Sequence, residues 1–505
     1  MVYWLALDAD LDRALTRAQF LRAAGGVAGM LAFPAAASAA AGRSPAVARA
    51  ARHAFQSFRS RPDLRPPSIT MIGGAAGAQA VSGEGYSFLA PQSAQGCQPG
   101  LMIVDSGGDV VWFKPLPSGL WATNFAVQEY RGEPVLTWWE GRLVNPPGYG
   151  HGEGVILDSS YREVARVRAG RGRSADLHEF VLTPEGTALI TCYPPTLQMD
   201  LSASGGSGPG SVLESVIQEI DVASGRVLLE WRSLEHLGLG ESFGGDYDPV
   251  HVNSIDVMSD GNLLVSARHT WALYKLERRR GRVIWRLGGK RSDFRVGSRA
   301  RFSWQHDARH AAPNTITLFD DGAGERATES QSRGVVLDVD FKRRSVRLGA
   351  AYHHPKPILA SAMGSMRTLP DGNVVVDFGS APVLTEFAAD GSLISDLHLA
   401  GPQASYRGLR FPWSATPATP PAVAVIAGPS PGTCALYASW NGATSLASWQ
   451  LNSGSSPGSL QPGAVTPRDG FETAIPVQAA SGYASVTACD SSGRPLATSR
   501  AIELP

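Results

Sequence analysis

A short hairpin unit recurs through the chain and limits what it can fold into. Strand-like segments meet at tight turns of similar composition, at Gly107-Gly108, Ser224-Gly225, Arg280-Gly281 and Asp390-Gly391. Glycine supplies the positive φ that such turns require. Many short hairpins at repeated spacing favour an all-β chain whose sheets repeat radially, as in a β-propeller.

The charge of the chain excludes two classes of partner. Its 505 residues include 45 Lys+Arg and 45 Asp+Glu, so the formal net charge is zero. A nucleic-acid binder or a polybasic membrane-surface protein needs a basic footprint that this composition lacks. A hydrophobic content of 43% also argues against a largely disordered chain.

A second class of hairpin carries chemistry. Counting back eight positions from successive turn residues reaches His178, Asn253, His306 and Gly364. His251 lies two positions before Asn253, so on a strand the two share a face. Equivalent positions of successive blades point toward a common axis. The repeat therefore predicts that His178, His251, Asn253 and His306 converge near one mouth of the central channel.

The hairpin that begins at His251 returns through Arg268, which can lie across from His251 or Asn253. Imidazoles gathered with a guanidinium make an anion site, because arginine offers a bidentate fork to sulfate, phosphate or carboxylate. A single histidine at the start of a strand is more often a structural hydrogen-bond donor. Three in one repeat position favour a shared site instead. The remaining candidates lack this equivalence and are interpreted as structural or surface residues: His269, His310, His353 and His354.

Composition divides the chain into five segments. Residues 1–41 have the pattern of an export signal, which resembles a twin-arginine signal with Ala18 in the place of the second arginine. We expect a linker at 42–72, the propeller at 73–413, a Thr/Pro linker at 414–421 and a small domain at 422–505. The last segment alternates small, apolar and polar residues, which is typical of an immunoglobulin- or fibronectin-like β-sandwich. We expect a secreted or extracytoplasmic protein without a membrane span, exported by a Tat-like or Sec route, whose last domain could contact cell wall or a protein.

The four cysteines fit an oxidising compartment. Cys434 and Cys489 both lie in strand-like segments of the last domain and could form a disulfide. Cys97 and Cys192 could form a second disulfide, although the sequence does not place them near each other.

Seven motifs stand in order along the chain: Asp176-Leu177-His178-Glu179-Phe180, His251-Val252-Asn253-Ser254-Ile255-Asp256, Ser266-Ala267-Arg268-His269-Thr270, Trp285-Arg286-Leu287-Gly288-Gly289-Lys290, Gln305-His306-Asp307-Ala308-Arg309, Ser332-Arg333-Gly334 and Ser405-Tyr406-Arg407. Together they resemble the arylsulfotransferase (ASST-type) family, in its branch of secreted actinobacterial and fungal proteins. The resemblance covers about residues 60–413.

The resemblance implies a six-bladed propeller that catalyses PAPS-independent transfer of a sulfuryl group from an aryl sulfate to a phenol. His306 is then the nucleophile that becomes transiently sulfated. His178, His251 and Arg268 hold the sulfuryl oxygens and assist proton transfer, and Asn253 supports them in binding the substrate. Neither a metal nor a nucleotide cofactor is expected. Four tryptophans could line the substrate site or fill the core between blades: Trp138, Trp139, Trp271 and Trp304.

Two other functions compete with sulfuryl transfer. An extracellular propeller without catalytic activity could bind an anionic ligand through Arg268. A metal-dependent hydrolase or lyase could use the three histidines as zinc ligands. The adjacent Arg268 counts against the metal, because a fixed cation beside a divalent ion is unfavourable.

Overall fold

The computed structural model of the chain is all-β, as the sequence predicts. It describes residues 54–73, 85–92, 96–144, 148–202, 208–245, 247–401, 403–428, 430, 432–478 and 482–505. The expected export signal at 1–41 lies outside the described residues and stays a prediction. Over the described ranges, the regular elements are strands and three short 3-10 helices: η2 (Ser233–Glu235), η3 (Leu239–Glu241) and η4 (Ser298–Ala300). The described part of the chain has no helix long and apolar enough to cross a membrane.

Between residues 69 and 411, six sheets of at least four strands follow one another along the described chain. Their strands pair antiparallel except for the short β19 (Arg295–Val296), which pairs in parallel with β23 (Ser345–Tyr352). The first contains β2 (Tyr86–Leu89), β3 (Gly100–Val104), β4 (Val110–Pro115) and the distant β28 (Leu409–Phe411). The second contains β5 (Trp121–Tyr130), β6 (Glu133–Val144), β7 (Tyr149–Leu157) and β8 (Glu163–Val167). The third contains β9 (Phe180–Leu182), β10 (Thr187–Cys192), β13 (Val216–Asp221) and β14 (Val227–Arg232), with a separate hairpin of β11 (Leu197–Asp200) and β12 (Pro209–Val212).

The next three sheets repeat the same arrangement. The fourth contains β15 (Val252–Val257), β16 (Leu263–Ala267), β17 (Ala272–Leu276) and β18 (Val283–Gly288). The fifth contains β20 (His306–Ala312), β21 (Thr315–Asp320), β22 (Arg333–Asp340) and β23 (Ser345–Tyr352), extended by β19 (Arg295–Val296). The sixth contains β24 (Ser365–Thr368), β25 (Val374–Asp377), β26 (Val383–Phe387) and β27 (Leu393–Leu399), extended by β1 (Ile69–Gly73).

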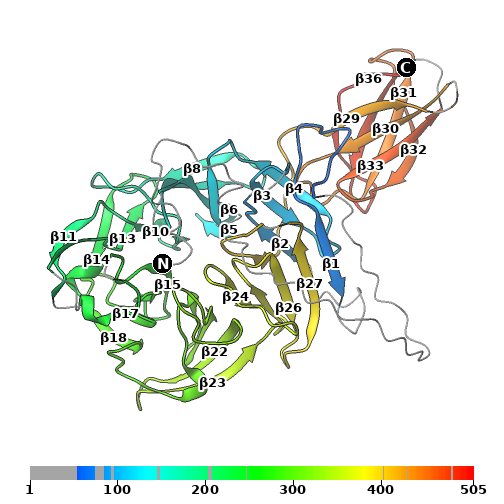
Figure 1. Cartoon of the computed structure of the whole chain (residues 1–505). Helices are drawn as coiled ribbons and strands as arrows, with labels where there is room; N and C mark the ends of the chain where they lie inside the picture. Colours follow the sequence, from blue (N-terminus) through cyan, green and yellow to red (C-terminus); the bar gives the residue numbers. More distant parts are fainter. Residues whose placement is uncertain are drawn as a thin grey trace, which may run out of the picture.

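The sheets lie around a common centre, and β5, β15 and β24, each the first strand of its sheet, lie on the inner side (Figure 1). Hydrogen bonds join these inner strands: Ala308 N donates to Ser254 Oγ at 3.0 Å, and Met366 N donates to Asp307 Oδ2 at 3.3 Å. The two ends of this part of the chain close the ring, because β28 adds to the first sheet and β1 adds to the sixth. Residues that begin β9, β15, β20 and β24 are therefore carried to one place.

Trp138 and Trp139 fill the core and do not line a site. Both side chains are 1% exposed. They are neighbours on β6, so they point to opposite faces: Trp138 packs against the first sheet and Trp139 against the third. Room for Trp139 comes from glycines on β7, since a Cβ on Gly150 or Gly152 would lie 2.6–2.7 Å from its ring.

Residues 422–505 form a separate unit beside the ring (Figure 1). One sheet contains β29 (Ala422–Ala427), β30 (Thr433–Ser439) and β33 (Glu472–Gln478). The other contains β31 (Ser448–Gly454), β32 (Gln461–Pro467), β34 (Tyr483–Cys489) and β35 (Pro495–Thr498), and β36 (Ile502–Glu503) also pairs with β34. A shared apolar core joins the two sheets. The unit is bound to the ring through Tyr161 Oη, which donates to Gly442 O at 2.8 Å, and Phe113 N, which donates to Asn441 Oδ1 at 2.9 Å.

The expected disulfide between Cys434 and Cys489 is wrong. All four cysteines are free and buried. Cys434 pairs with Val477 near the end of β33, beside the point where the chain crosses to begin β34. Cys489 is the last residue of β34, so about six residues, or roughly 20 Å of strand, separate it from that end of the sandwich. A disulfide requires Cα atoms within about 7 Å.

Filling the space beside Trp139 should destabilise the fold. In Gly152→Ala, the new Cβ would lie 2.2 Å from Glu140 O and 2.7 Å from the Trp139 ring. We expect a loss of about 1–3 kcal/mol in the free energy of unfolding, because both neighbours are fixed. Gly238→Ala is the control, since a Cβ there meets nothing within 4 Å and its φ is −84°. Urea unfolding that finds the two variants equally stable would contradict this packing.

Candidate active site

Three predicted histidines meet at the centre of the ring. His178 precedes β9, His251 precedes β15, and His306 is the first residue of β20. The ring centroids of His178 and His251 are 4.7 Å apart. The Tyr406 ring connects His178 to His306: its centroid lies 5.8 Å from the His178 ring and 6.3 Å from the His306 ring. The three imidazoles are buried, with exposures between 3% and 8%.

Each of the three imidazoles is held by a buried carboxylate through Nδ1. The distances are 2.5 Å from His178 to Asp176 Oδ2, 2.6 Å from His251 to Asp248 Oδ2, and 2.8 Å from His306 to Asp321 Oδ2. A carboxylate on Nδ1 fixes both the ring orientation and the tautomer. Nε2 of each ring then remains for chemistry.

The three aspartates differ in their own hydrogen bonds. Asp176 accepts bonds from Gly150 N at 2.8 Å, His178 N at 3.0 Å and Thr191 Oγ1 at 3.1 Å, besides the imidazole. Oδ1 of Asp248 and Oδ1 of Asp321 are buried and have no hydrogen-bond partner among the described residues. Asp176 is therefore a well-stabilised carboxylate, and the other two are not.

The pKa values of the aspartates follow these surroundings. Burial opposes the charge of Asp176, but the interaction with His178 and the backbone N–H groups outweighs it, so its pKa is lowered. Burial raises the pKa of Asp248 and that of Asp321. Burial also lowers the pKa of His306, and the nearby Arg268 adds to the effect. Burial likewise lowers the pKa of His251, and His178 and Arg268 lower it further. His251 and His306 are thus neutral at pH 7.

The backbone before β24 covers His306 and Arg268. Met363 N donates to His306 Nε2 at 3.3 Å, and Arg268 Nη2 donates to Ser361 O at 2.9 Å. A backbone N–H can only donate, so Nε2 carries a lone pair and the proton of His306 is on Nδ1. We call residues 361–363 the strap.

Arg268 lies beside His251, as the hairpin predicts. Its N–H donates to His251 O at 2.9 Å. The guanidinium stacks over Trp304 at 4.9 Å, and its Nε is buried without a hydrogen-bond partner among the described residues. Trp304 is fully buried, so of the predicted tryptophans it is the one that supports the site directly.

His269 is part of the site, which corrects its interpretation as a structural or surface residue. Arg268 Nη1 lies 2.8 Å from His269 Nε2, and the His269 ring is 4.6 Å from the His251 ring. Its Nδ1 is hydrogen-bonded to the Asp248 carbonyl. Burial, with His251 nearby, lowers the pKa of His269 to about 3, so the ring is neutral. Its Nε2 therefore accepts a hydrogen bond from the guanidinium of Arg268. Sequence reasoning missed it because it has no equivalent in the other repeats.

Asn253 is bound to the residue that precedes His306. Its Nδ2 donates to Gln305 O at 2.7 Å, one residue before His306, and its Oδ1 is buried without a partner among the described residues. Its carbonyl accepts bonds from Tyr406 Oη at 3.3 Å and Arg407 Nη2 at 3.0 Å. The predicted substrate-binding residue thus has a free amide oxygen and a structural amide nitrogen.

A buried ionic network lies behind the histidines. Glu179 and Asp307 directly follow His178 and His306 in the chain. Arg407 donates to Glu179 at 2.6 Å, and Arg309 donates to both acids at 2.7 and 2.8 Å. Arg367 also pairs with Asp307. Because these residues come from four different segments, the network fixes the inner strands relative to one another.

Trp271 lies at the edge of the site. Its ring stacks on Phe243 at 3.9 Å and contacts Trp304 at 5.3 Å, and the Arg326 guanidinium lies 5.2 Å above it. The aromatic residues nearest the histidines are tyrosines: the Tyr193 ring lies 5.5 Å from His178 and 5.9 Å from His251.

The geometry does not favour the three-histidine metal site. Among the described residues, the group with metal-ligand spacing is Asp248, His251 and His269, without His178 or His306. Both ring nitrogens of His269 already have hydrogen-bond partners, and one partner is the guanidinium of Arg268. A divalent cation there would face that fixed positive charge.

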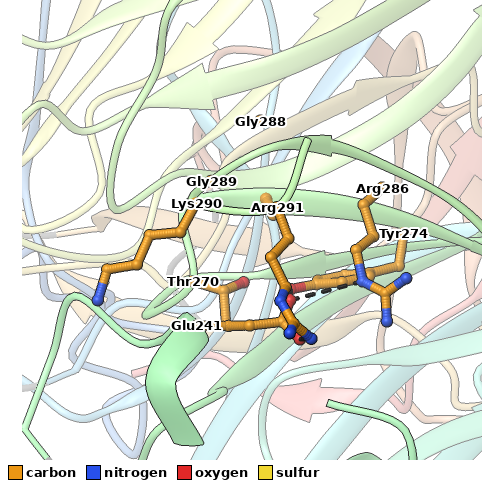
Figure 2. Close-up of a pocket in the computed structure, with 9 residues that line it drawn as sticks. Glu241, Thr270, Tyr274, Arg286, Gly288, Gly289, Lys290 and Arg291 are labelled. Atoms are coloured by element: carbon orange, nitrogen blue, oxygen red, sulfur yellow. Dashed lines mark hydrogen bonds and ion pairs between the residues drawn. The ribbon is translucent and has the colours of Figure 1, made fainter. Parts of the chain in front are cut away.

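The Trp285–Lys290 motif has a supporting role. A small pocket beside β17, β18 and η3 is lined by Glu241, Arg286, Lys290 and Arg291 (Figure 2). Arg286 and Arg291 each lie 3.5 Å from Glu241, and Lys290 Nζ donates to Gly240 O at 3.2 Å. These contacts hold η3, and the chain leads from it toward Asp248 and His251.

A sequence profile of the arylsulfotransferase (ASST) family matches residues 126–399. The chain belongs to this family. The matched range contains His178, His251, Arg268 and His306, so its activity at family level is that of a sulfotransferase. No curated protein matches the chain significantly.

The arylsulfotransferase chain is also similar to solved structures at low identity. A protein of unknown function from Bacteroides caccae is 12% identical, and the alignment spans 65% of this chain and 99% of that protein with a TM-score of 0.40. Catalytically inactive virginiamycin B lyase from Staphylococcus aureus is 8% identical, with 66% and 99% covered and a TM-score of 0.34. The periplasmic gluconolactonase of Pseudomonas aeruginosa is 13% identical, with 77% and 99% covered and a TM-score of 0.36. These values carry no information on activity.

Neutralising one member of the buried network should destabilise the fold strongly. Glu179 is 1% exposed and pairs with Arg309 and Arg407. We expect Glu179→Gln to lower the free energy of unfolding by about 3–5 kcal/mol, because it leaves a buried cation uncompensated. Glu163→Gln is the matched control; its side chain is 45% exposed beside Arg166, so we expect a change below about 1 kcal/mol. Equal denaturant midpoints for the two variants would overturn the role of the network.

Proposed function

We propose that this protein transfers a sulfuryl group from an aryl sulfate ester to a phenol through a transient sulfohistidine at His306. The observation that carries the proposal is the state of His306: a buried, neutral imidazole with Nδ1–H on Asp321 and a lone pair on Nε2. We also propose that the six sheets are the blades of a propeller and that residues 422–505 are an immunoglobulin- or fibronectin-like sandwich, which a crystal structure would test. A cell-wall or protein contact of that sandwich stays a prediction.

The reaction divides into two displacements at sulfur. In the first, His306 Nε2 forms the N–S bond while the S–O bond to the aryl group breaks. In the second, the oxygen of an acceptor phenol attacks sulfur, and the N–S electrons return to Nε2. A covalent intermediate of this kind replaces one difficult step by two easier ones.

Arg268 supplies fixed positive charge beside the nucleophile. Its Nε has no partner among the described residues, and its stack on Trp304 keeps the guanidinium in place. Preorganised donors aimed at developing charge in a buried site stabilise a transition state more than donors in water do. Arg268 can therefore hold sulfuryl oxygens together with His178 and His251. Tyr193 and Tyr406 offer aromatic faces beside these histidines.

The strap has to shift when the donor binds. Met363 N occupies the lone pair of His306 that would attack sulfur, and Ser361 O occupies one guanidinium N–H of Arg268. The sulfuryl oxygens can replace the carbonyl on Arg268. The N–H of Met363 is then placed to donate to a sulfuryl oxygen instead of the imidazole.

Non-catalytic anion binding is the second candidate. The Nε of the buried Arg268 has no partner in the described part of the chain, which favours binding of an anion whether or not a reaction follows. This candidate gives Arg268-dependent binding of an aryl sulfate without release of the phenol, so turnover separates the two.

The proposed activity can be tested directly with 4-nitrophenyl sulfate in EDTA. We expect release of 4-nitrophenol that accelerates with added phenol and falls by at least about 10³-fold in His306→Ala, because the nucleophile is lost. His310→Ala is the matched control; His310 lies four residues along the same strand and outside the site, and we expect its rate to match the unchanged protein. No release from the folded protein with several phenols would leave anion binding as the better function. Release only after a metal is added would favour the hydrolase or lyase.

The pH dependence should show the lowered pKa of His306. Since burial and Arg268 lower this pKa, the neutral nucleophile persists below the ordinary value of about 6.5. The value of kcat/KM for 4-nitrophenyl sulfate, whose leaving group needs little protonation, should therefore stay level as pH falls through 6.5 and decline only at lower pH. A decline centred near 6.5 would contradict a buried, neutral His306.

A further inference from the structure

The three aspartate–histidine pairs have the same Nδ1 contact but differ in the other hydrogen bonds that each aspartate accepts. Asp176 accepts four hydrogen bonds, two of them from His178 itself. Asp321 accepts one from His306, and its second oxygen is buried without a partner among the described residues. One hydrogen bond to Nδ1 is enough to orient an imidazole, as it does for His306. The additional hydrogen bonds to Asp176 therefore bear on the charge of its carboxylate.

A protonated imidazole needs a stable anion beside it. Asp176 meets this need because N–H and O–H donors surround its carboxylate, and two of them come from β7 and β10. The other groups that face the His178 ring are Tyr193, His251 and Tyr406, none of which is a cation at pH 7. The guanidinium of Arg407 donates to the backbone carbonyl of His178 at 3.2 Å and not to its imidazole.

His306 is in the opposite situation. Burial is the main cause of its lowered pKa, and among the nearby groups Arg268 lowers the pKa most, ahead of His251, His178 and Arg407. Burial raises the pKa of Asp321, and neither the field of Arg268 nor a backbone hydrogen bond at Asp321 itself outweighs that effect. The other group that supports its charge is the imidazole N–H of His306. A second proton on His306 is therefore unfavourable, while an Nδ1–H tautomer is enforced.

His251 is less suited to carry a proton than His178. Its carboxylate partner Asp248 has an oxygen without a partner among the described residues and lies 4.0 Å from His269 Nδ1. Its pKa is lowered by burial and by both His178 and Arg268.

We propose that Asp176 and Asp321 are positioning residues with opposite effects: Asp176 makes His178 the acid that protonates the leaving phenolate, and Asp321 keeps the lone pair of His306 on Nε2. This inference rests on the proposed sulfuryl transfer. In the first displacement the phenolate takes the electron pair of the S–O bond and the Nε2 proton of His178. In the second, His178 recovers a proton from the acceptor phenol as that oxygen attacks sulfur. Nδ1–H of His306 stays on Asp321 throughout, where the carboxylate offsets the positive charge of the sulfated ring.

The test compares two donors that differ only in the basicity of their leaving group. Phenolate is more basic than 4-nitrophenolate, so phenyl sulfate depends more on an acid. We expect Asp176→Asn to lower kcat/KM for phenyl sulfate by about 10²–10³-fold and for 4-nitrophenyl sulfate by less than about tenfold. Thr191→Val, which removes one hydrogen bond from Asp176, should give the same preference at smaller magnitude.

Asp321→Asn should give a different signature. An amide donating to Nδ1 reverses the tautomer and moves the proton to Nε2, so both donors should lose activity alike, by roughly 10³–10⁴-fold. Asp248→Asn is the matched control, since its pair lacks the acid role; we expect it also to affect both donors alike. Circular dichroism and unfolding midpoints establish that each variant is folded.

Two outcomes would overturn the inference. An equal loss for both donors in Asp176→Asn and Thr191→Val would remove the acid role from His178. An Asp321→Asn protein that still cleaves 4-nitrophenyl sulfate at the unchanged rate would remove the tautomer role. If the unchanged protein cleaves neither donor, the proposed function fails first; an active protein without these differences refutes only the assignment of the aspartates.

Discussion

The site depends on a carboxylate bound to Nδ1 of each central histidine. Free imidazole exchanges its proton between two nitrogens, and a nucleophile at Nε2 exists only in one tautomer. Asp321 selects that tautomer for His306, and the donation from Met363 N shows that the lone pair is on Nε2. Burial lowers the pKa of His306 and so keeps the ring neutral. With the ring neutral, the positive charge of Arg268 remains available for an anionic group.

The propeller-like ring supplies these groups from equivalent positions. His178, Asn253, His306 and Gly364 enter their sheets eight residues before a turn, and Tyr193, Arg268, Asp321 and Gly379 leave seven residues after the same turn. The first strand of each hairpin and its return strand therefore bring one residue each to the centre. Glu179 and Asp307, one residue further along, turn to the other side and bind Arg309 and Arg407. That ionic network holds the inner strands at the spacing that the histidines need.

Periodicity made the fold and the histidines predictable, and contacts between sheets were harder to foresee. Turn residues located the four inner strands, and the hairpin placed Arg268 beside His251. The return strand that carries Arg268 has equivalents in the other repeats, and the same count places Tyr193 and Asp321 there. His269 has no such signal, because its role comes from its neighbours Arg268 and Asp248. The disulfide failed for a similar reason: strand-like context for Cys434 and Cys489 does not say at which end of the sandwich each lies.

The most direct test of the central claim is to find the sulfuryl group on the protein. The chain is incubated with 4-nitrophenyl sulfate in the absence of a phenol, quenched, and examined by intact mass and by peptide fragmentation. Sulfuryl transfer through the Asp321-held imidazole predicts one sulfuryl group per chain, attached to His306 and lost when phenol is added. Rapid release of 4-nitrophenol with no protein-bound sulfuryl group, or with the group on another residue, would contradict it.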